Sequence, residues 1–445
     1  MRTGYKLGIA VALVLAGSMW YYVQNAYLGH QLAEEAAHHS PSGIFSDLYP
    51  RWLGTRELLL HRRNPYSPEV TREIQIGYYG RPLDANRPGD PKDQAGFAYP
   101  LYVVFLLAPA TTLRFPVVRL GFRWFLILLT GWSVPLWLRT LQWRAPFAVS
   151  TILAALTLGS FPVVQGVELE QLSLLVSGMI AACVFLVVRG RLWQAGCLLA
   201  LATIKPHLVL LMAAWLLLWA LGNLGARQRL LWGFGLTMMA LLGGAEWFLP
   251  GWMRQFVAAM AAYRRYTGRS GSVLAFVTTS GWGLALSVVI LLALAIVCWR
   301  ARHAPAGTPR FAFVCSLVLT VTIVVIPTTA VYNQVLLLPA VLLLVRHAVA
   351  AWGKDRITRL IWSVAGSLLV WPWLAALGLG LAPLFVPLAA VQKAWGLPIY
   401  TSLAFPPVLL ILLMYTYHEF SGLSPAAKSP APAATGRASW RSSAC

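Results

Sequence analysis

The chain has 445 residues, of which 58% are hydrophobic and only 11% are charged, and its mean hydropathy is +0.67. Soluble domains carry roughly 25% charged residues, so this composition excludes a soluble globular protein and indicates an integral membrane protein. A net charge of +21 would suggest a nucleic-acid partner in a soluble protein. No basic-aromatic nucleic-acid module is visible, so we expect no nucleic acid and place the Lys and Arg residues in short cytoplasmic loops.

The first apolar run covers residues 5–23, with Arg2 and Lys6 at its start. Basic residues before an apolar run also characterise a secretory signal peptide, whose cleavage point would fall near Ala16-Gly17-Ser18. We favour an uncleaved first span, because the family resemblance described below requires one. The five cysteines show neither a disulfide framework nor the spacing of a metal site.

Eleven further apolar runs approach the length of about 20 residues that a membrane-spanning helix needs. Lipid cannot satisfy open backbone groups, so each run is predicted to be helical. The sequence therefore predicts an all-α polytopic membrane protein with roughly twelve spans. The further runs are 117–138, 147–164, 171–188, 192–204, 206–222, 229–249, 281–299, 311–326, 334–347, 357–380 and 399–417.

The basic residues predict how the chain is oriented in the membrane. With the N-terminus in the cytoplasm, nearly every cytoplasmic turn is basic, as the positive-inside rule requires. Loops 24–97 and 250–280 then lie outside. Lys205 and the arginines of loop 250–280 depart from the rule. The basic residues of the cytoplasmic turns and tail are Arg139, Arg144, Arg189, Arg191, Arg227, Arg229, Arg300, Arg302, Arg310, Arg346, Lys354, Arg356, Arg359, Lys428, Arg437 and Arg441.

Two segments are treated as exceptions to the pattern of spans. Residues 97–113, FAYPLYVVFLLAPATTL, are apolar, but a span here would place the arginine pairs outside. We therefore expect a short interfacial or re-entrant helix between Pro100 and Pro116. Residues 421–445 are rich in Ser, Ala and Pro and are predicted to form a disordered cytoplasmic tail, which leaves 1–420 as the membrane domain.

Residues 47–63, DLYPRWLGTRELLLHRR, are predicted to form a helix on the membrane surface that ends before Asn64 and Pro65. Ser46 or Asp47 suits the N-cap of this helix. Asp47 thus has two interpretations. It is either a helix cap that pairs with Arg51 one turn on, or a catalytic carboxylate at the membrane surface.

Four stretches occur in a fixed order: Asp47 with RELLLHRRNPYSP, then FAYPLYVVFLLAP, then the segment 169–211 that begins LEQLSLLV, then IPTTAVYNQVLLLPAVLLL. Over about residues 1–350 they resemble glycosyltransferase family 87 of the GT-C superfamily, whose known members are bacterial mannosyltransferases. The chain departs from that family in two places. Glu170-Gln171 stands where Gly-Gln is common, and Leu101 follows Tyr99-Pro100 where a second Pro is common.

The resemblance implies a GT-C-type helix bundle in the plasma membrane of a bacterium. It implies transfer of mannose or another hexose from a polyprenyl-phosphate carrier to a hydroxyl of a lipid or glycan on the extracytoplasmic face. The acidic residue of the first outer loop is the catalytic base in related enzymes, and Asp47 is the matching position. A carboxylate that deprotonates the acceptor as the anomeric carbon becomes oxocarbenium-like predicts inversion of configuration.

Positive groups are expected near the leaving phosphate. Lys205, beside the helix-breaking Pro206, is one candidate, and a lysine that snorkels to the interface is the alternative. Arg264, Arg265 and Arg269 are further candidates, because the guanidinium fork binds phosphate well. Contact of these arginines with lipid headgroups is their alternative.

Polar and aromatic residues near the outer ends of the spans are candidates for contact with acceptor or sugar. Glu168 and Glu170, two apart on a helix, are not expected to face the same way, and solvated loop acids are their alternative. His207 is alternatively a helix-end histidine, and residues 332–334 alternatively an ordinary turn. The candidates are Arg51, Tyr99, Glu168, Glu170, Gln171, His207, Tyr332, Asn333 and Gln334.

The sequence also bears on cofactors and on competing functions. No Asp-x-Asp pair occurs in the outer loops, which favours transfer without a divalent metal or other cofactor; a metal site formed by Asp84, Asp90 and Asp93 in a folded loop is the alternative. No Walker or Rossmann motif is present, so direct use of a nucleotide sugar is not expected. A transporter or flippase of a lipid-linked substrate remains an alternative, although no internal repeat is visible. A non-catalytic partner in envelope synthesis is a third interpretation.

Overall fold

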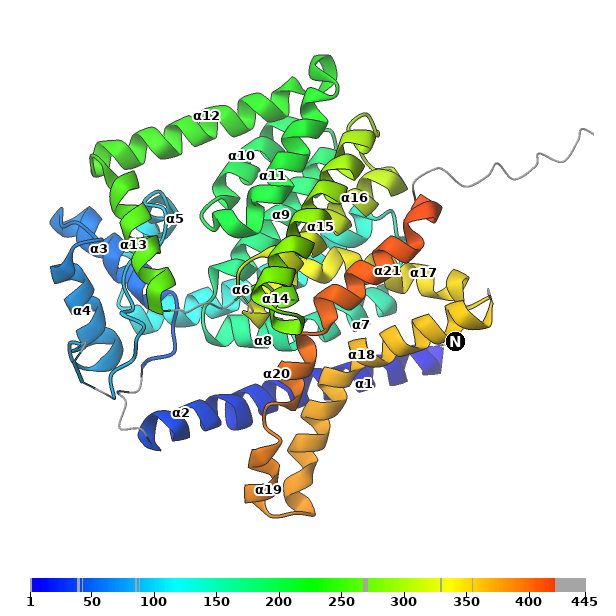
Figure 1. The fold of residues 1–445 in the computed structure, drawn as a ribbon, viewed down its shortest axis with the longest axis horizontal. Helices are drawn as coiled ribbons and strands as arrows, with labels where there is room; N and C mark the ends of the chain where they lie inside the picture. Colours follow the sequence, from blue (N-terminus) through cyan, green and yellow to red (C-terminus); the bar gives the residue numbers. More distant parts are fainter. Residues whose placement is uncertain are drawn as a thin grey trace, which may run out of the picture.

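The computed structural model describes residues 2–37, 41, 43–84, 86–87, 89–266, 271–328, 330–353 and 355–420 (Figure 1). Within these ranges the chain forms helices and no strand, which confirms the predicted all-α class. Seven of its helices are long and apolar enough to cross a membrane, or eight if one bent pair counts as a single span. The remaining four predicted runs form apolar helices of 10–17 residues, shorter than a full span.

The first helix is longer than predicted. α1 (Arg2–Tyr22) continues through a π-helix (Val23–Tyr27) into α2 (Leu28–Ala37), so the outer loop does not begin at residue 24. Burial explains the difference, because Val23 and Tyr27 pack among other apolar side chains. The ring of Tyr27 lies edge-on to Phe161 at 5.6 Å between centroids. Its hydroxyl accepts a hydrogen bond from the Gln165 amide at 2.9 Å.

Two helices and a turn form the next segment. α3 (Tyr49–His61) confirms the helix predicted over 47–63 and its end before Asn64, and it is followed by α4 (Pro68–Tyr79), which was not predicted. The N-cap residue of α3 is Leu48, which makes no side-chain cap, and Ser46 Oγ accepts the N–H of Tyr49 at 3.3 Å. Ser67 is the N-cap of α4, and its Oγ accepts the N–H of Val70 at 3.3 Å.

The apolar stretch 97–113 does not form a span. It contains α5 (Val103–Leu107) and a 3₁₀ turn (Ala108–Ala110), which together are too short to cross a bilayer. The stretch is fixed from two sides. The indole N–H of Trp52 donates to the carbonyl of Ala110 at 3.0 Å. The hydroxyl of Tyr102 donates to the carbonyl of Thr203 at 3.0 Å. The prediction of a short helix here is confirmed.

The remaining helices build the bundle. α9 and α16 are apolar on nearly all faces and almost wholly buried, so they lie at its centre. Peripheral helices instead expose large apolar side chains such as Phe147 and Trp247, as expected for contact with lipid. The bounds are α6 (Phe115–Thr140), α7 (Phe147–Leu158), α8 (Phe161–Glu168), α9 (Leu172–Val188), α10 (Leu192–Ala202), α11 (Pro206–Leu221), α12 (Leu224–Phe248), α13 (Trp252–Tyr266), α14 (Val273–Val277), α15 (Ser280–Ala301), α16 (Pro309–Val325), a 3₁₀ helix (Val331–Leu337), α17 (Leu338–Trp352), α18 (Arg356–Leu381), a 3₁₀ turn (Ala382–Leu384), α19 (Leu388–Lys393), α20 (Leu397–Ser402) and α21 (Phe405–Phe420).

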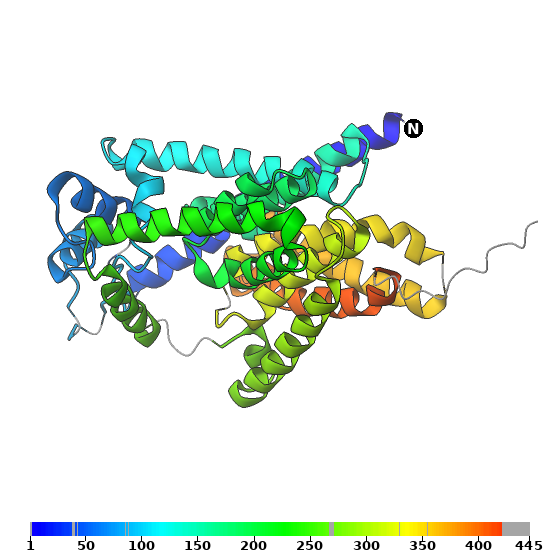
Figure 2. The same ribbon diagram turned by 90° about the horizontal axis from the view of Figure 1, so that it is seen from above.

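The molecule has two distinct ends. The end of α2 and helices α3, α4, α5 and α13 gather on the left in Figure 1, and this region is called the loop end below. The start of α1 and the end of α21 lie at the opposite end, as the turned view in Figure 2 also shows. The predicted disordered tail, 421–445, lies outside the described residues.

Candidate active site

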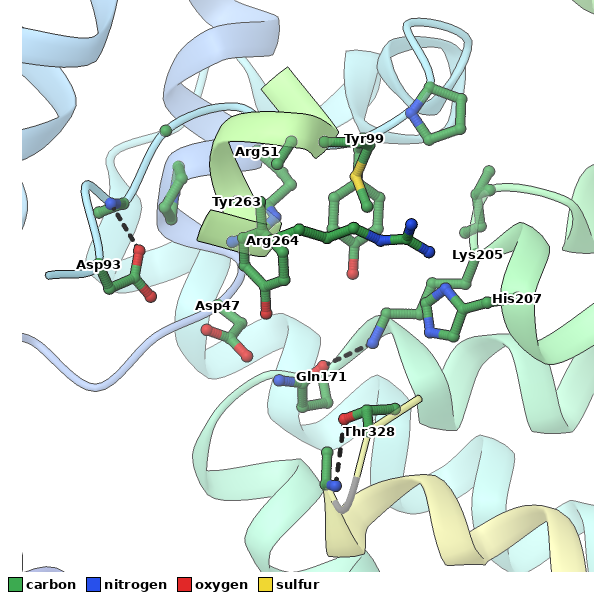
Figure 3. Close-up of a pocket in the computed structure, with 18 of the residues that line it drawn as sticks. Asp47, Arg51, Asp93, Tyr99, Gln171, Lys205, His207, Tyr263, Arg264 and Thr328 are labelled. Carbon is green, nitrogen blue, oxygen red and sulfur yellow. Dashed lines mark hydrogen bonds between the residues drawn. The ribbon is translucent and has the colours of Figure 1, made fainter. Parts of the chain in front are cut away.

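A cavity of about 580 Å³ lies at the loop end. Its walls come from segments that are far apart in the sequence, and Figure 3 shows most of its polar side chains directed inward. The segments are the start of α3, the end of α4, the stretch before α5, the break between α10 and α11, helix α13 and the turn after α16. Tertiary folding therefore brings together most of the separate regions of the sequence that contain predicted site residues.

Asp47 lies at the wall of this cavity, two residues before α3. Its backbone N–H donates to the carbonyl of Leu169 at 2.8 Å. Within the part of the chain that the structure describes, its carboxylate accepts no hydrogen bond and forms no ion pair, and it does not cap α3. Burial raises the pKa of Asp47 above its ordinary value, while the charges of Arg51 and Lys205 oppose that rise. The carboxylate is therefore available to a ligand and has a raised affinity for a proton.

Arg51 lies one turn along α3 from Asp47. Its guanidinium stacks over the ring of Tyr99, with 4.6 Å from Cζ to the ring centroid. Its Nε is buried and has no hydrogen-bond partner among the described residues. A buried N–H without a partner is costly, so a ligand in the cavity would gain by accepting from it.

Lys205 lies in the break between α10 and α11. Pro206 cannot donate a backbone hydrogen bond, and Lys205 itself has non-helical angles of φ −119° and ψ 79°. Its side chain is directed inward and is 6% exposed, which rules out a lysine that snorkels to the interface. The ammonium donates to Gln171 Oε1 at 2.9 Å and to Ser173 Oγ at 2.7 Å.

The partners of Lys205 belong to a longer network. The hydroxyl of Ser173 donates in turn to Asn333 Oδ1 at 2.7 Å, so the network links α9 to the 3₁₀ helix Val331–Leu337. The ammonium also lies 5.3 Å from the ring centroid of Tyr332. No carboxylate forms an ion pair with Lys205 in the described ranges, and the charge of Asp47 acts on its ammonium across the cavity.

The three arginines proposed for the phosphate separate in the structure. Arg264 lines the cavity, and in Figure 3 its guanidinium extends toward the side that carries Lys205 and His207. Arg265 lines a neighbouring cavity of about 400 Å³ instead. Consecutive residues of an α-helix point about 100° apart, so α13 directs only one of this pair inward. Arg269 lies outside the described residues.

Most of the residues predicted to contact acceptor or sugar lie at the cavity. Gln334 does not, because its amide donates to the carbonyl of Ser402 at 3.0 Å. Because a 3₁₀ helix has three residues per turn, the side chain of Gln334 points in a different direction from that of the preceding Asn333. The predicted residues that line the cavity are Arg51, Tyr99, Gln171, His207, Tyr332 and Asn333.

The structure corrects the predicted directions of the Glu168 and Glu170 side chains. Neither side chain lines the cavity, and both contact the same residue. Both form ion pairs with Arg123 of α6, at 2.9 Å from Glu168 Oε2 and 2.6 Å from Glu170 Oε1. The helical spacing assumed for them is wrong because α8 ends at Glu168, and Glu170 has a left-handed φ of 48°. Glycine adopts this conformation readily, so the glutamate stands at a position that suits glycine.

Several cavity residues were not predicted from the sequence. Tyr78 and Tyr79 end α4 as a visible pair in GYYG, and Tyr263 directly precedes Arg264 and Arg265 in α13. Asp93 comes from a turn-rich stretch, where periodicity gives no signal. Tyrosine combines an apolar ring with a hydroxyl, which suits the mixed surface of a sugar. The residues missed are Tyr78, Tyr79, Asp93, Tyr263 and Thr328.

The charges around the cavity favour a negatively charged ligand. Arg51, Lys205 and Arg264 contribute positive charge, whereas Asp47 and Asp93 contribute negative charge. Among the described residues, no cluster of three or more His, Cys, Asp or Glu side chains could hold a metal ion. The arrangement can therefore bind an anion beside a carboxylate that accepts no hydrogen bond from the described residues.

The model of glycosyltransferase family 87 matches residues 97–327, just over half of the chain. The match includes the stretch before α5, the Lys205 break and α13, but it begins after Asp47 and α3. No curated protein and no solved structure matches the chain.

Proposed function

The chain belongs to glycosyltransferase family 87, and we propose that it transfers mannose or another hexose from a polyprenyl-phosphate carrier to a hydroxyl of a lipid or glycan acceptor. One observation carries the proposal. The carboxylate of Asp47, which has no hydrogen-bond partner among the described residues, lines the same cavity as the ammonium of Lys205. A base and a phosphate site in one cavity are what this reaction needs.

The proposed reaction is a single displacement at the anomeric carbon. The acceptor oxygen forms the new bond to that carbon while the bond from the carbon to the phosphate oxygen breaks. Asp47 takes the proton from the acceptor hydroxyl, which a raised pKa assists. Lys205 and Arg264 stabilise the charge on the departing polyprenyl phosphate. Attack opposite the leaving group inverts the configuration.

The size of the cavity supports a ligand of this kind. Its volume of about 580 Å³ falls within the roughly 300–1,000 Å³ typical of small-molecule sites. A hexose and its phosphate fit such a volume, and a prenyl chain does not. We therefore propose that the prenyl chain leaves the cavity and lies against the apolar surface of the bundle, in the lipid.

We further propose a location and a metal requirement. The basic turns favour a cytoplasmic N-terminus, which would put the loop end and the cavity on the extracytoplasmic face of a bacterial plasma membrane. Transfer is proposed to need no divalent metal, since Asp47 and Asp93 are the two acidic side chains of the described lining.

Reconstitution of the purified chain in liposomes tests the proposal. The donor is a labelled polyprenyl-phosphate-mannose, with the glucose and galactose forms in parallel, and the acceptor is a membrane-lipid or glycan extract. We expect label in the acceptor fraction, with and without EDTA, and none from a nucleotide sugar alone. Movement of intact donor across the bilayer without transfer would instead indicate a flippase and would overturn the proposal.

A further inference from the structure

The segment that carries Asp47 is held by bonds from three other elements. The N–H of Ile44 donates to the carbonyl of Tyr78 at 3.2 Å, and the N–H of Asp47 donates to the carbonyl of Leu169 at 2.8 Å. From α6, Arg119 Nη2 donates to the carbonyl of Ile44 at 3.0 Å and to that of Phe45 at 3.4 Å. Arg119 thus binds the backbone two and three residues before Asp47.

The turn on the other side of Asp47 is held in the same way. Arg123 Nη2 donates to the carbonyl of Glu168 at 2.7 Å, next to the Leu169 carbonyl that Asp47 contacts. Each of the two arginines therefore binds one of the two backbone segments that meet at Asp47. Neither arginine is among the residues that line the cavity.

Glu170 joins the two arginines. It is fully buried, and its Oε1 accepts from Arg119 Nε at 3.0 Å and from Arg123 Nε at 2.6 Å. A buried carboxylate is costly without such partners, and two guanidinium groups supply them with fixed geometry. One carboxylate thus fixes the spacing of the two arginines, and the arginines fix the two backbone segments.

Both segments also hold a residue in the left-handed region of φ. Phe45 has a φ of 47° and Glu170 a φ of 48°, and neither is a glycine. Such conformations persist only where the surroundings enforce them. Here the surroundings are Arg119, Arg123 and Glu170, which we call the clamp. The clamp therefore holds two strained backbone segments in place where they meet at Asp47.

We propose that the clamp positions Asp47 for proton transfer, so that Arg119, Arg123 and Glu170 are positioning residues of the reaction. This inference rests on the proposed function, in which Asp47 is the base. A reacting group displaced by about 1 Å can lose roughly 100-fold in rate. None of the three clamp residues lines the cavity, so loss of the clamp should lower kcat and leave the KM for the donor unchanged.

Arg119→Lys is the decisive variant. Lysine keeps the charge, but its single ammonium cannot hold Glu170 and the Ile44 and Phe45 carbonyls together. We expect kcat to fall about 100-fold at unchanged donor KM. We also expect faster hydrogen–deuterium exchange in a peptide covering 43–48. Glu170→Gln, which keeps the size and removes the charge, should show the same pattern and serves if Arg119→Lys does not fold.

Arg227→Lys is the matched control. Arg227 is also an arginine that donates to several backbone carbonyls, including those of Trp219 and Arg302, but it is buried and does not line the cavity. This variant should lose thermal stability while its kcat and its exchange over 43–48 stay at the wild-type values. A purely structural role of the clamp would make Arg119→Lys behave like this control.

The outcomes separate the two proposals. Unchanged exchange over 43–48 in both clamp variants, or an unchanged kcat, would overturn the clamp whatever the wild-type activity is. Increased exchange together with a kcat loss at constant KM supports it. Absence of transfer by the wild type would instead overturn the proposed function, and the exchange experiment would still report on the clamp.

Discussion

Replacement of Asp47 by asparagine removes the negative charge at the cavity wall and keeps the size of the side chain. The substitution separates the two interpretations that the sequence allows. A helix cap contributes to stability, whereas a catalytic base contributes to turnover. In the structure the side chain of Asp47 does not cap α3, and Ser46 Oγ accepts the N–H of Tyr49, the first residue of that helix.

The expected effects on stability and turnover differ in sign and size. The carboxylate has no hydrogen bond or ion pair within the described part of the chain, so the free energy of unfolding should change by less than about 0.5 kcal/mol from lost contacts. Burial raises its pKa in the folded protein, so its contribution to stability is full below the unfolded pKa and is lost as pH rises through the folded pKa. At neutral pH Asp47→Asn should therefore melt at or above the wild-type Tm. Loss of the base should lower kcat by roughly 10²–10⁴-fold.

The assay compares kcat and Tm of purified, reconstituted Asp47→Asn with those of Ser67→Ala. Ser67 caps α4, the helix that follows α3, and does not line the cavity. Loss of that cap should cost about 1 kcal/mol of stability with kcat unchanged. A variant Asp47→Asn that melts earlier, as Ser67→Ala does, but turns over like the wild type would show that Asp47 is structural and not the base.

Three further predictions follow from the cavity. Lys205→Met should raise the donor KM by roughly 10–100-fold, the size of a lost charged hydrogen bond, in a titration with polyprenyl-phosphate-hexose. Arg264→Ala should lower kcat/KM by tenfold or more, whereas Arg265→Ala, whose side chain lines the neighbouring cavity, should change it less than about twofold. In a pH series, wild-type kcat/KM should fall on the acid side as Asp47 takes up a proton. Because its pKa is raised, this loss should come at a higher pH than for a free aspartate near 3.9, and it should be absent from the residual activity of Asp47→Asn.

Local signals allowed much of the fold to be predicted. Proline and asparagine limit the helix over 47–63, and the prolines at 100 and 116 limit the short apolar stretch, as the structure has them. The end of the first helix was missed because polarity begins at Gln24. Burial of Val23 and Tyr27 against the bundle extends the helix there regardless of local polarity.

The site was only partly predictable, for a related reason. Residues beside proline breaks or polar turns, such as Lys205 and Tyr332, carried a local signal. Asp93 carried none, since only tertiary folding brings its turn to the cavity. The sequence does contain one signal for the clamp. Arg119 and Arg123 lie inside the apolar run 117–138, and charged residues in a span usually have partners. The side-chain direction of Glu170 followed from a left-handed φ that no residue pattern reveals.

The unbroken first helix has a consequence for where the reaction takes place. Its 34 residues from Gly4 to Ala37 span about 50 Å at 1.5 Å per residue. The hydrocarbon core of a bilayer is only about 30 Å thick, so the helix must either tilt or project beyond it. The helix begins at the opposite end of the molecule and α2 ends at the loop end, so its length sets the distance between the two ends. The height of the cavity above the lipid surface then depends on the thickness of the bilayer. An acceptor anchored in that membrane would have to reach this height.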